Sequence, residues 1–198
     1  MKKLKLFLSV AIMAMLFSTV YGQDNNIYDE GVIINGVKWA TRNVSEIPNT
    51  FVSNPENYGG LFQWNRTVSD DFLLLNAYNK GRYQRPDSWL PANNPCPSGW
   101  RVPTRDELES LLDAENEWTT LNDINGRKFG TAPNQIFLPA AGSYARFIDR
   151  GDGKRGFYWS SSSKDARSAF SVTFLEKGSN WIMDIVKENG LSVRCVAE

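Results

Sequence analysis

The alternation of apolar and polar residues predicts a chain with more strand than helix. Two apolar runs flank Asn35-Gly36 and predict a β-hairpin over residues 31–43, because both turn residues tolerate a positive φ. A second Asn-Gly turn is predicted within residues 124–129. Further strands are predicted at residues 58–64, 136–139, 157–160, 169–175, 181–186 and 191–196. The last three are expected to form a small antiparallel sheet with turns at Gly178 and Gly190.

Residues 96–104 place a cysteine, a turn, a tryptophan and a helix start within one short stretch. Thr104 and Glu107 have the spacing of a capping box, and leucines follow at helical spacing. A helix is therefore predicted from Thr104 to about Ala114. The favoured interpretation is that this stretch is scaffold, with Trp100 packed in a core.

The N-terminus has the features of a secretory signal peptide. Three lysines precede an apolar run over residues 6–20, and Gly22 is a small residue at the expected cleavage point. We expect residues 1–22 to be removed and residues 23–198 to form a single domain, secreted to the periplasm or the cell surface. The alternative is a retained anchor, but no second long apolar stretch follows, so no stable membrane span is expected after cleavage.

Charge and composition exclude several functions. Three of the 22 basic residues leave with the signal, so 19 basic residues face 22 acidic ones, a formal charge of −3. Nucleic acid is therefore not an expected partner. The chain has no histidine, which disfavours a zinc site and a serine or cysteine nucleophile. We expect no metal, no cofactor and no enzyme activity. A calcium loop at residues 149–153 is disfavoured, because it lacks further oxygen ligands.

The two cysteines, Cys96 and Cys195, are predicted to form a disulfide. An even pair in an exported chain is typical of a structural bridge. A redox or nucleophilic thiol is the alternative, disfavoured because no histidine is present to act as a base.

Two stretches are candidate binding surfaces. One is the serine-rich turn over residues 160–167 with the neighbourhood of Trp181, where hydroxyls, charges and an indole face a ligand. The other is the irregular stretch over residues 69–94. In both, the structural alternative is that these residues tie down loops or complete the sheet. The candidate ligand-binding residues are Ser161, Ser162, Ser163, Lys164, Arg167, Asn180, Trp181, Tyr83 and Trp89.

Five ordered sequence blocks carry a family resemblance. They are Ile34-Asn35-Gly36-Val37-Lys38-Trp39-Ala40, Tyr58-Gly59-Gly60-Leu61-Phe62-Gln63-Trp64, Cys96-Pro97-Ser98-Gly99-Trp100-Arg101-Val102-Pro103-Thr104, Tyr158-Trp159-Ser160-Ser161-Ser162 and Ser192-Val193-Arg194-Cys195-Val196. The set resembles the Fibrobacter succinogenes major paralogous domain, a family of exported bacterial domains, and spans nearly all of the expected mature chain. Residues 69–94 do not match the family pattern.

This resemblance implies a C-type lectin-like fold, related in outline to formylglycine-generating enzymes and to the variable proteins of diversity-generating retroelements. With the strand pattern it predicts an α+β fold of mostly antiparallel strands, one or two short helices and long loops. The expected function is an exported, non-catalytic binding module that recognises a glycan or an envelope protein at the bacterial cell envelope. The alternative is a structural or interaction subunit of a surface assembly. A formylglycine-generating-type enzyme is less expected, because Cys96 and Cys195 are predicted to be structural.

Overall fold

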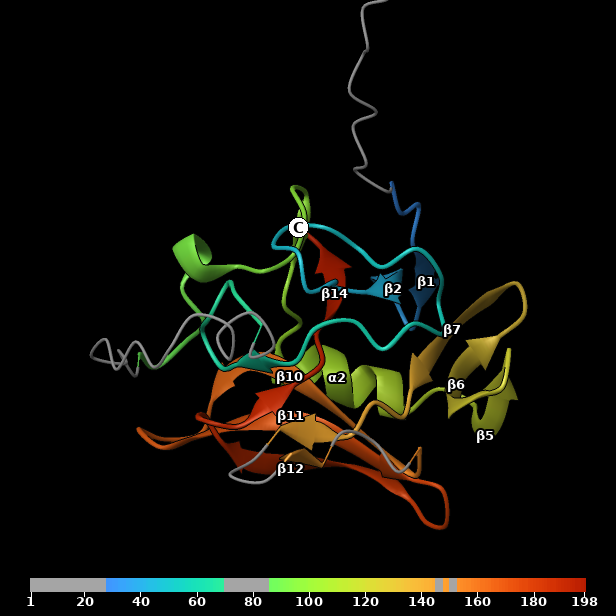
Figure 1. Cartoon of the computed structure of the whole chain (residues 1–198). Coiled ribbons are helices and arrows are strands. Elements are labelled where there is room, and N and C mark those ends of the chain that lie inside the picture. Colours follow the sequence, from blue (N-terminus) through green and yellow to red (C-terminus); the bar gives the residue numbers. More distant parts are fainter. Residues whose placement is uncertain (1–27, 70–85, 145–147, 150–152) are drawn as a thin grey trace, which may run out of the picture.

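The computed structural model describes residues 28–69, 86–144, 148–149 and 153–198, which fold into antiparallel sheets around one α-helix (Figure 1). The predicted signal peptide lies outside these residues. The helix is α2 (Arg105–Leu112), and a 3-10 turn, η1, covers Pro91–Asn93. The strands are β1 (Val32–Ile34), β2 (Val37–Asn43), β3 (Phe62–Gln63), β4 (Trp100–Arg101), β5 (Asn116–Leu121), β6 (Ile124–Thr131), β7 (Asn134–Pro139), β8 (Ser143–Tyr144), β9 (Ile148–Asp149), β10 (Arg155–Ser163), β11 (Ser168–Leu175), β12 (Asn180–Val186), β13 (Gly190–Leu191) and β14 (Arg194–Ala197).

These strands form four sheets, with the orders β1-β2-β14-β4, β10-β11-β12, β3-β13-β8-β9 and β5-β6-β7. The fold is β-rich, which corrects the predicted α+β, C-type lectin-like class. The described part of the chain has one eight-residue α-helix, too little to build a separate helical layer. Leu108 and Leu111 of that helix are buried in a core shared with the sheets. The expectation of mostly antiparallel strands agrees with the observed pairing.

The two predicted Asn-Gly turns have different outcomes. Asn35 and Gly36 have φ values of 47° and 81° and join β1 to β2, as predicted. Asn125-Gly126 does not form a turn, because β6 runs through it and the β5–β6 turn lies at Asn122-Asp123, with φ values of 46° and 64°. Gly126 is needed inside the strand, since a Cβ there would lie 2.4 Å from the Leu138 carbonyl oxygen.

The remaining predicted strands are present, with two changes. Residues 58–64 are extended into a strand only at Phe62–Gln63. The predicted last strand over residues 191–196 is divided into β13 and β14, which belong to different sheets. Gly190 is consequently part of β13 and does not lie in a turn.

The capping box at the start of α2 is confirmed. Thr104 Oγ1 accepts a hydrogen bond from the Glu107 amide at 3.3 Å, and Glu107 Oε2 accepts one from the Thr104 amide at 2.7 Å. Arg101 donates both arms of its guanidinium to the same carboxylate, at 2.8 and 2.6 Å. Burial alone would raise the pKa of Glu107, but the hydrogen bonds from Arg101 and Thr104 outweigh it and lower this pKa below its ordinary value of 4.5.

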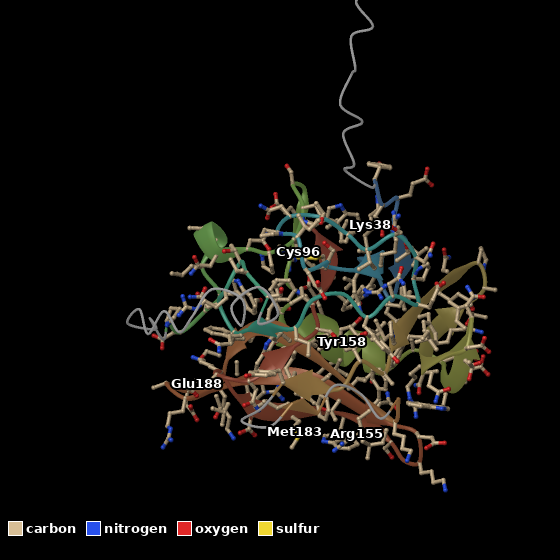
Figure 2. All side chains as sticks on the ribbon, viewed as in Figure 1. Lys38, Cys96, Arg155, Tyr158, Met183 and Glu188 are labelled. Atoms are coloured by element: carbon tan, nitrogen blue, oxygen red, sulfur yellow. A yellow bond between two sulfur atoms is a disulfide. The ribbon has the colours of Figure 1, made fainter. Side chains whose placement is uncertain are left out.

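The predicted disulfide is confirmed. Cys96 and Cys195 are bonded, with their Cα atoms 6.1 Å apart, and both are buried (Cys96 is labelled in Figure 2). The bond fastens β14 to the turn that precedes β4. Trp100 is 8% exposed and packs edge-on against Phe51, as expected of a scaffold residue. Neither cysteine is a free thiol.

A buried polar network joins β14, β2, β7 and β10. The guanidinium of Arg194 donates to the Asn43 side chain at 3.0 Å, the Ala40 carbonyl at 3.1 Å and the Phe137 carbonyl at 2.9 Å. Tyr158, labelled in Figure 2, accepts from the Asn43 amide and donates to the carbonyl of Pro139. Burial lowers the pKa of Arg194 to about 10 and raises the pKa of Tyr158 to about 12. These side chains hold the sheets in register.

No helix in the described ranges is long and apolar enough to cross a membrane.

Candidate functional site

The serine-rich turn predicted as a binding surface is fixed by hydrogen bonds to other residues of the protein. Ser163 Oγ accepts from Lys187 Nζ at 2.7 Å and donates to the Asp165 carbonyl at 2.8 Å. Ser162 Oγ accepts from the Arg105 amide at 3.0 Å, and the Ser161 amide and carbonyl are both bonded to backbone. These contacts favour the structural interpretation of the turn, because the hydroxyls of Ser162 and Ser163 and the backbone of Ser161 already have partners.

Lys187 is the buried anchor of this turn. It is fully buried, and its ammonium donates to the Pro86 and Asp165 carbonyls as well as to Ser163. The ammonium also lies 4.2 Å from the centre of the Trp64 ring, where a cation–π attraction adds to the hydrogen bonds. Three oxygens and one aromatic face thus compensate the cost of burying this charge.

The charged residues of the turn lie at the surface. Lys164 pairs with Asp184 across the sheet at 2.9 Å, and both side chains are nearly half exposed. Arg167 is exposed, and its amide donates to the carboxylate of Asp165 at 2.7 Å. The backbone hydrogen bonds from Arg167 and Ser168 lower the pKa of Asp165. These are the interactions of a solvated, well-ordered turn.

Trp181 and Asn180 do not join the turn in one site. Ser168 pairs with Val186 at one end of β11–β12, whereas Thr173 pairs with Trp181 near the other end. Five residues along β11 separate the two positions, roughly 16 Å at about 3.3 Å per residue. Trp181 is 37% exposed and shares its face of β12 with Met183, which Figure 2 labels.

Of the two aromatic candidates in residues 69–94, Tyr83 lies outside the described residues. Trp89 is 8% exposed, packs edge-on against Trp64 at 5.6 Å and donates its indole N–H to the Asn93 carbonyl at 2.8 Å. Its ring and its polar group are thus both used inside the protein. This position favours the alternative that the aromatic residue pins the loop to the core.

A cavity of about 270 Å³ lies elsewhere, between β2, the loop at Pro55 and the β5-β6-β7 sheet. Its lining mixes hydroxyl, amide, ammonium and apolar groups. The lining residues are Thr41, Pro55, Thr119, Thr120, Leu121, Lys128, Gln135, Ile136 and Phe137. In Figure 1 the strands that form it are the blue β2 and the yellow β5, β6 and β7.

The register of the sheet explains the floor of this cavity. Glu117, Lys128 and Phe137 are directly opposite one another on β5, β6 and β7, so they share one face of the sheet. Thr119 and Gln135 lie on the same face by the two-residue period of each strand. The opposite face carries Phe129, Ile136 and Leu138 into the core.

One hydrogen bond ties the loop wall of the cavity to the sheet. The Asn122 amide, in the β5–β6 turn, donates to Glu56 Oε1 at 2.9 Å. Glu56 follows Pro55 directly, so this contact holds the Pro55 side of the cavity against the sheet.

Several polar groups of the cavity keep hydrogen-bonding capacity. Thr119 and Gln135 make no side-chain hydrogen bond to any other described residue. The hydroxyl of Thr41 donates a hydrogen bond to the Asp29 carboxylate at 3.0 Å, so its oxygen can still accept one from a ligand. Lys128 contacts Glu117 at 3.2 Å and has further N–H donors. The cavity can therefore donate hydrogen bonds to a polar ligand and accept hydrogen bonds from it.

Within the described ranges, no group of three or more histidine, cysteine, aspartate or glutamate side chains is placed to hold a metal ion. The cavity lining likewise holds no cysteine, histidine or paired carboxylate. The arrangement supplies non-covalent contacts and is suited to binding.

Fold and site define a β-rich domain that is fastened by a disulfide and carries a cavity of mixed polarity. The chain belongs to the Lcl C-terminal domain family, which matches residues 63–197. No curated protein and no solved structure matches the chain. The more specific resemblance to the Fibrobacter succinogenes major paralogous domain stays a prediction. Residues 28–62, which supply β1, β2 and the Pro55 wall, precede the family match.

The cavity is not among the binding surfaces predicted from the sequence. The strand β5 was not predicted, and residues 116–121 and 124–131 carry no sequence signal that distinguishes a cavity floor from a solvated surface. Only the approach of Thr41 and Pro55, more than 60 residues away in the chain, turns this face into a cavity.

Proposed function

We propose that this protein is an exported, non-catalytic binding module that recognises a glycan or a protein at the bacterial cell envelope. The observation that carries the proposal is the cavity of about 270 Å³, in which the side chains of Thr119 and Gln135 and the remaining N–H donors of Lys128 lie beside apolar side chains. Ligand sites in proteins typically combine an apolar lining with a few polar groups that orient the ligand.

Four further observations support the proposed location outside the cytoplasm. The N-terminal sequence has the pattern of a signal peptide, and the buried Cys96–Cys195 disulfide suits an oxidising compartment. Membership in the Lcl C-terminal domain family fits an extracellular or surface-associated domain. The blocks that resemble the Fibrobacter succinogenes major paralogous domain agree with an exported bacterial protein.

A glycan array probed with the exported chain tests this function. We expect saturable binding that is lost when Thr119→Val and Gln135→Leu are combined, because both free polar groups of the cavity are then apolar. Trp181→Ala is the control, since this residue does not line the cavity. If only the control variant loses binding, the binding site lies on β12 and not in the cavity.

The second candidate function is that of an interaction subunit in a surface assembly. It is favoured by β12, which pairs only with β11 among the described strands and exposes Trp181, Met183 and Val186. This candidate would be supported over the first if the glycan array shows no binding and one envelope protein co-purifies with the chain. Trp181→Ala should then abolish the co-purification.

A further inference from the structure

We infer that the cavity is the subsite for one neutral sugar ring at the end of a glycan, completed by a wall that lies outside the family match. The inference rests on the proposed binding function and narrows it to a ligand class. It depends on the charge, the size, the mixed polarity and the construction of the cavity.

The charge of the lining favours a neutral ligand. Lys128 is the one charged residue among the lining side chains, and its ammonium lies 3.2 Å from Glu117 Oε1. A ligand carboxylate that approached Lys128 would meet the carboxylate of Glu117, and a ligand amine would meet the ammonium. Hydroxyl groups can accept from Lys128 without either repulsion.

The size of the cavity limits the ligand to one ring. At about 270 Å³ it is slightly smaller than the sites that enclose drug-sized molecules, which begin at about 300 Å³. A chain of linked sugars does not fit inside. The end residue of a glycan does, with the rest of the chain leaving through the open side.

The mixed polarity of the lining fits a sugar ring in particular. A pyranose has apolar C–H faces and a rim of hydroxyl groups that donate and accept. Pro55, Leu121 and Phe137 offer apolar contact. Thr119 and Gln135 offer both donors and acceptors, while Thr41 can only accept, because its hydrogen is bonded to Asp29. The cavity thus presents both kinds of contact.

The wall of the cavity belongs to a part of the chain that the family match does not cover. Thr41 and Pro55 precede residue 63, whereas the floor from Thr119 to Phe137 lies within the match. Glu56 holds this wall to the β5–β6 turn through Asn122. The N-terminal segment therefore decides which ring fits a floor supplied by the family domain.

Saturation-transfer NMR with simple sugars tests the inference on the exported chain. The probes are methyl glycosides of glucose, galactose, mannose and N-acetylglucosamine, compared with glucuronate and glucosamine. We expect at least one neutral glycoside to bind with a dissociation constant on the order of millimolar, and the charged sugars to bind about tenfold more weakly or not at all. Thr119→Val should raise the dissociation constant of the neutral glycoside about tenfold, as expected for one lost hydrogen bond.

Two controls separate the site from the rest of the protein. Trp181→Ala should leave binding unchanged, and circular dichroism should show that Thr119→Val folds like the wild type. Glu56→Ala, which frees the wall, should weaken the neutral glycoside and reduce discrimination among the rings.

The outcomes that overturn the inference differ from those that overturn the proposed function. Tighter binding of glucuronate than of every neutral glycoside would refute the ligand class. Binding that survives Thr119→Val combined with Gln135→Leu would refute the cavity as the site, although the glycan-binding function would stand. No binding to any simple sugar and none on the glycan array would refute both the inference and glycan recognition as the proposed function.

Discussion

The disulfide between Cys96 and Cys195 should supply a large share of the stability of this domain. The bridge closes a loop with a sequence separation of 99 residues. In the chain-entropy model a loop of this length raises the free energy of unfolding by about 4.7 kcal/mol, because the cross-link restricts the unfolded chain. Measured effects of removing native disulfides are about 2–5 kcal/mol, a large part of the stability of a domain of this size.

Urea unfolding of the oxidised and the reduced wild-type chain, followed by tryptophan fluorescence, measures this effect. Extrapolated free energies should be compared, not midpoints, since the reduced unfolded chain exposes more surface and has a steeper dependence on urea. We expect the reduced chain to be less stable by about 2–5 kcal/mol. The double variant Cys96→Ala, Cys195→Ala should be slightly less stable than the reduced wild type, because both sulfurs pack in a core.

The single variants provide the internal control. Either Cys96→Ala or Cys195→Ala alone breaks the bridge, so each should cost nearly as much as the double variant and the losses should not add. If the oxidised and reduced chains differ by less than about 1 kcal/mol, or the single losses sum to the double loss, the reasoning from loop closure is wrong.

Three further predictions concern the polar side chains of Glu107, Lys187 and Tyr158. For Glu107→Gln, the free-energy difference from wild type should be largest above pH 4.5 and shrink as the pH falls through the lowered pKa of Glu107, measured by urea unfolding at several pH values. Lys187→Met should destabilise by about 2–3 kcal/mol, because three oxygens lose their donor, whereas Lys164→Met at an exposed pair should cost under about 1 kcal/mol; thermal unfolding of both compares them. Tyr158→Phe should lower the free energy of unfolding by about 1–3 kcal/mol, and ultraviolet titration of the wild type should show one tyrosine that ionises only near pH 12. Equal losses of stability in the two lysine variants would contradict the role of Lys187. The absence of a tyrosine that ionises near pH 12 would contradict the burial of Tyr158.

The correct sequence predictions are those in which a short stretch contains its own signal. The capping box of Thr104 and Glu107 and the Asn35-Gly36 hairpin depend on residues within a few positions of each other. The disulfide could also be predicted, since a chain with two cysteines allows only one intramolecular pairing.

The wrong predictions fail where distant residues decide the outcome. Asn125-Gly126 has the composition of a turn, but Gly126 lies under Phe137 and the Leu138 carbonyl, so the strand continues and the turn moves to Asn122-Asp123. The expected C-type lectin-like α+β class fails in the same way. The helix α2 packs in a core that it shares with the sheets, and its own amphipathic pattern does not reveal this arrangement.

The candidate site shows the same division. Several of the residues chosen for their hydroxyls and aromatic rings contact other parts of the protein: Ser163 accepts a hydrogen bond from Lys187, and Trp89 packs against Trp64. A side chain's chemistry is visible in the sequence, but whether it already has a partner is decided by what packs beside it.

The sequence by itself determined the strand-rich character, the helix start and the cysteine pairing, because each follows from composition or from neighbours along the chain. The export signal stays a prediction from the sequence. Tertiary structure alone decided the assembly of four sheets, the burial of Arg194 and the cavity between Thr41, Pro55 and β5-β6-β7. The physical reason is that a cavity and a buried charge depend on groups brought together from distant parts of the chain, and pairwise spacing in a sequence does not contain that proximity.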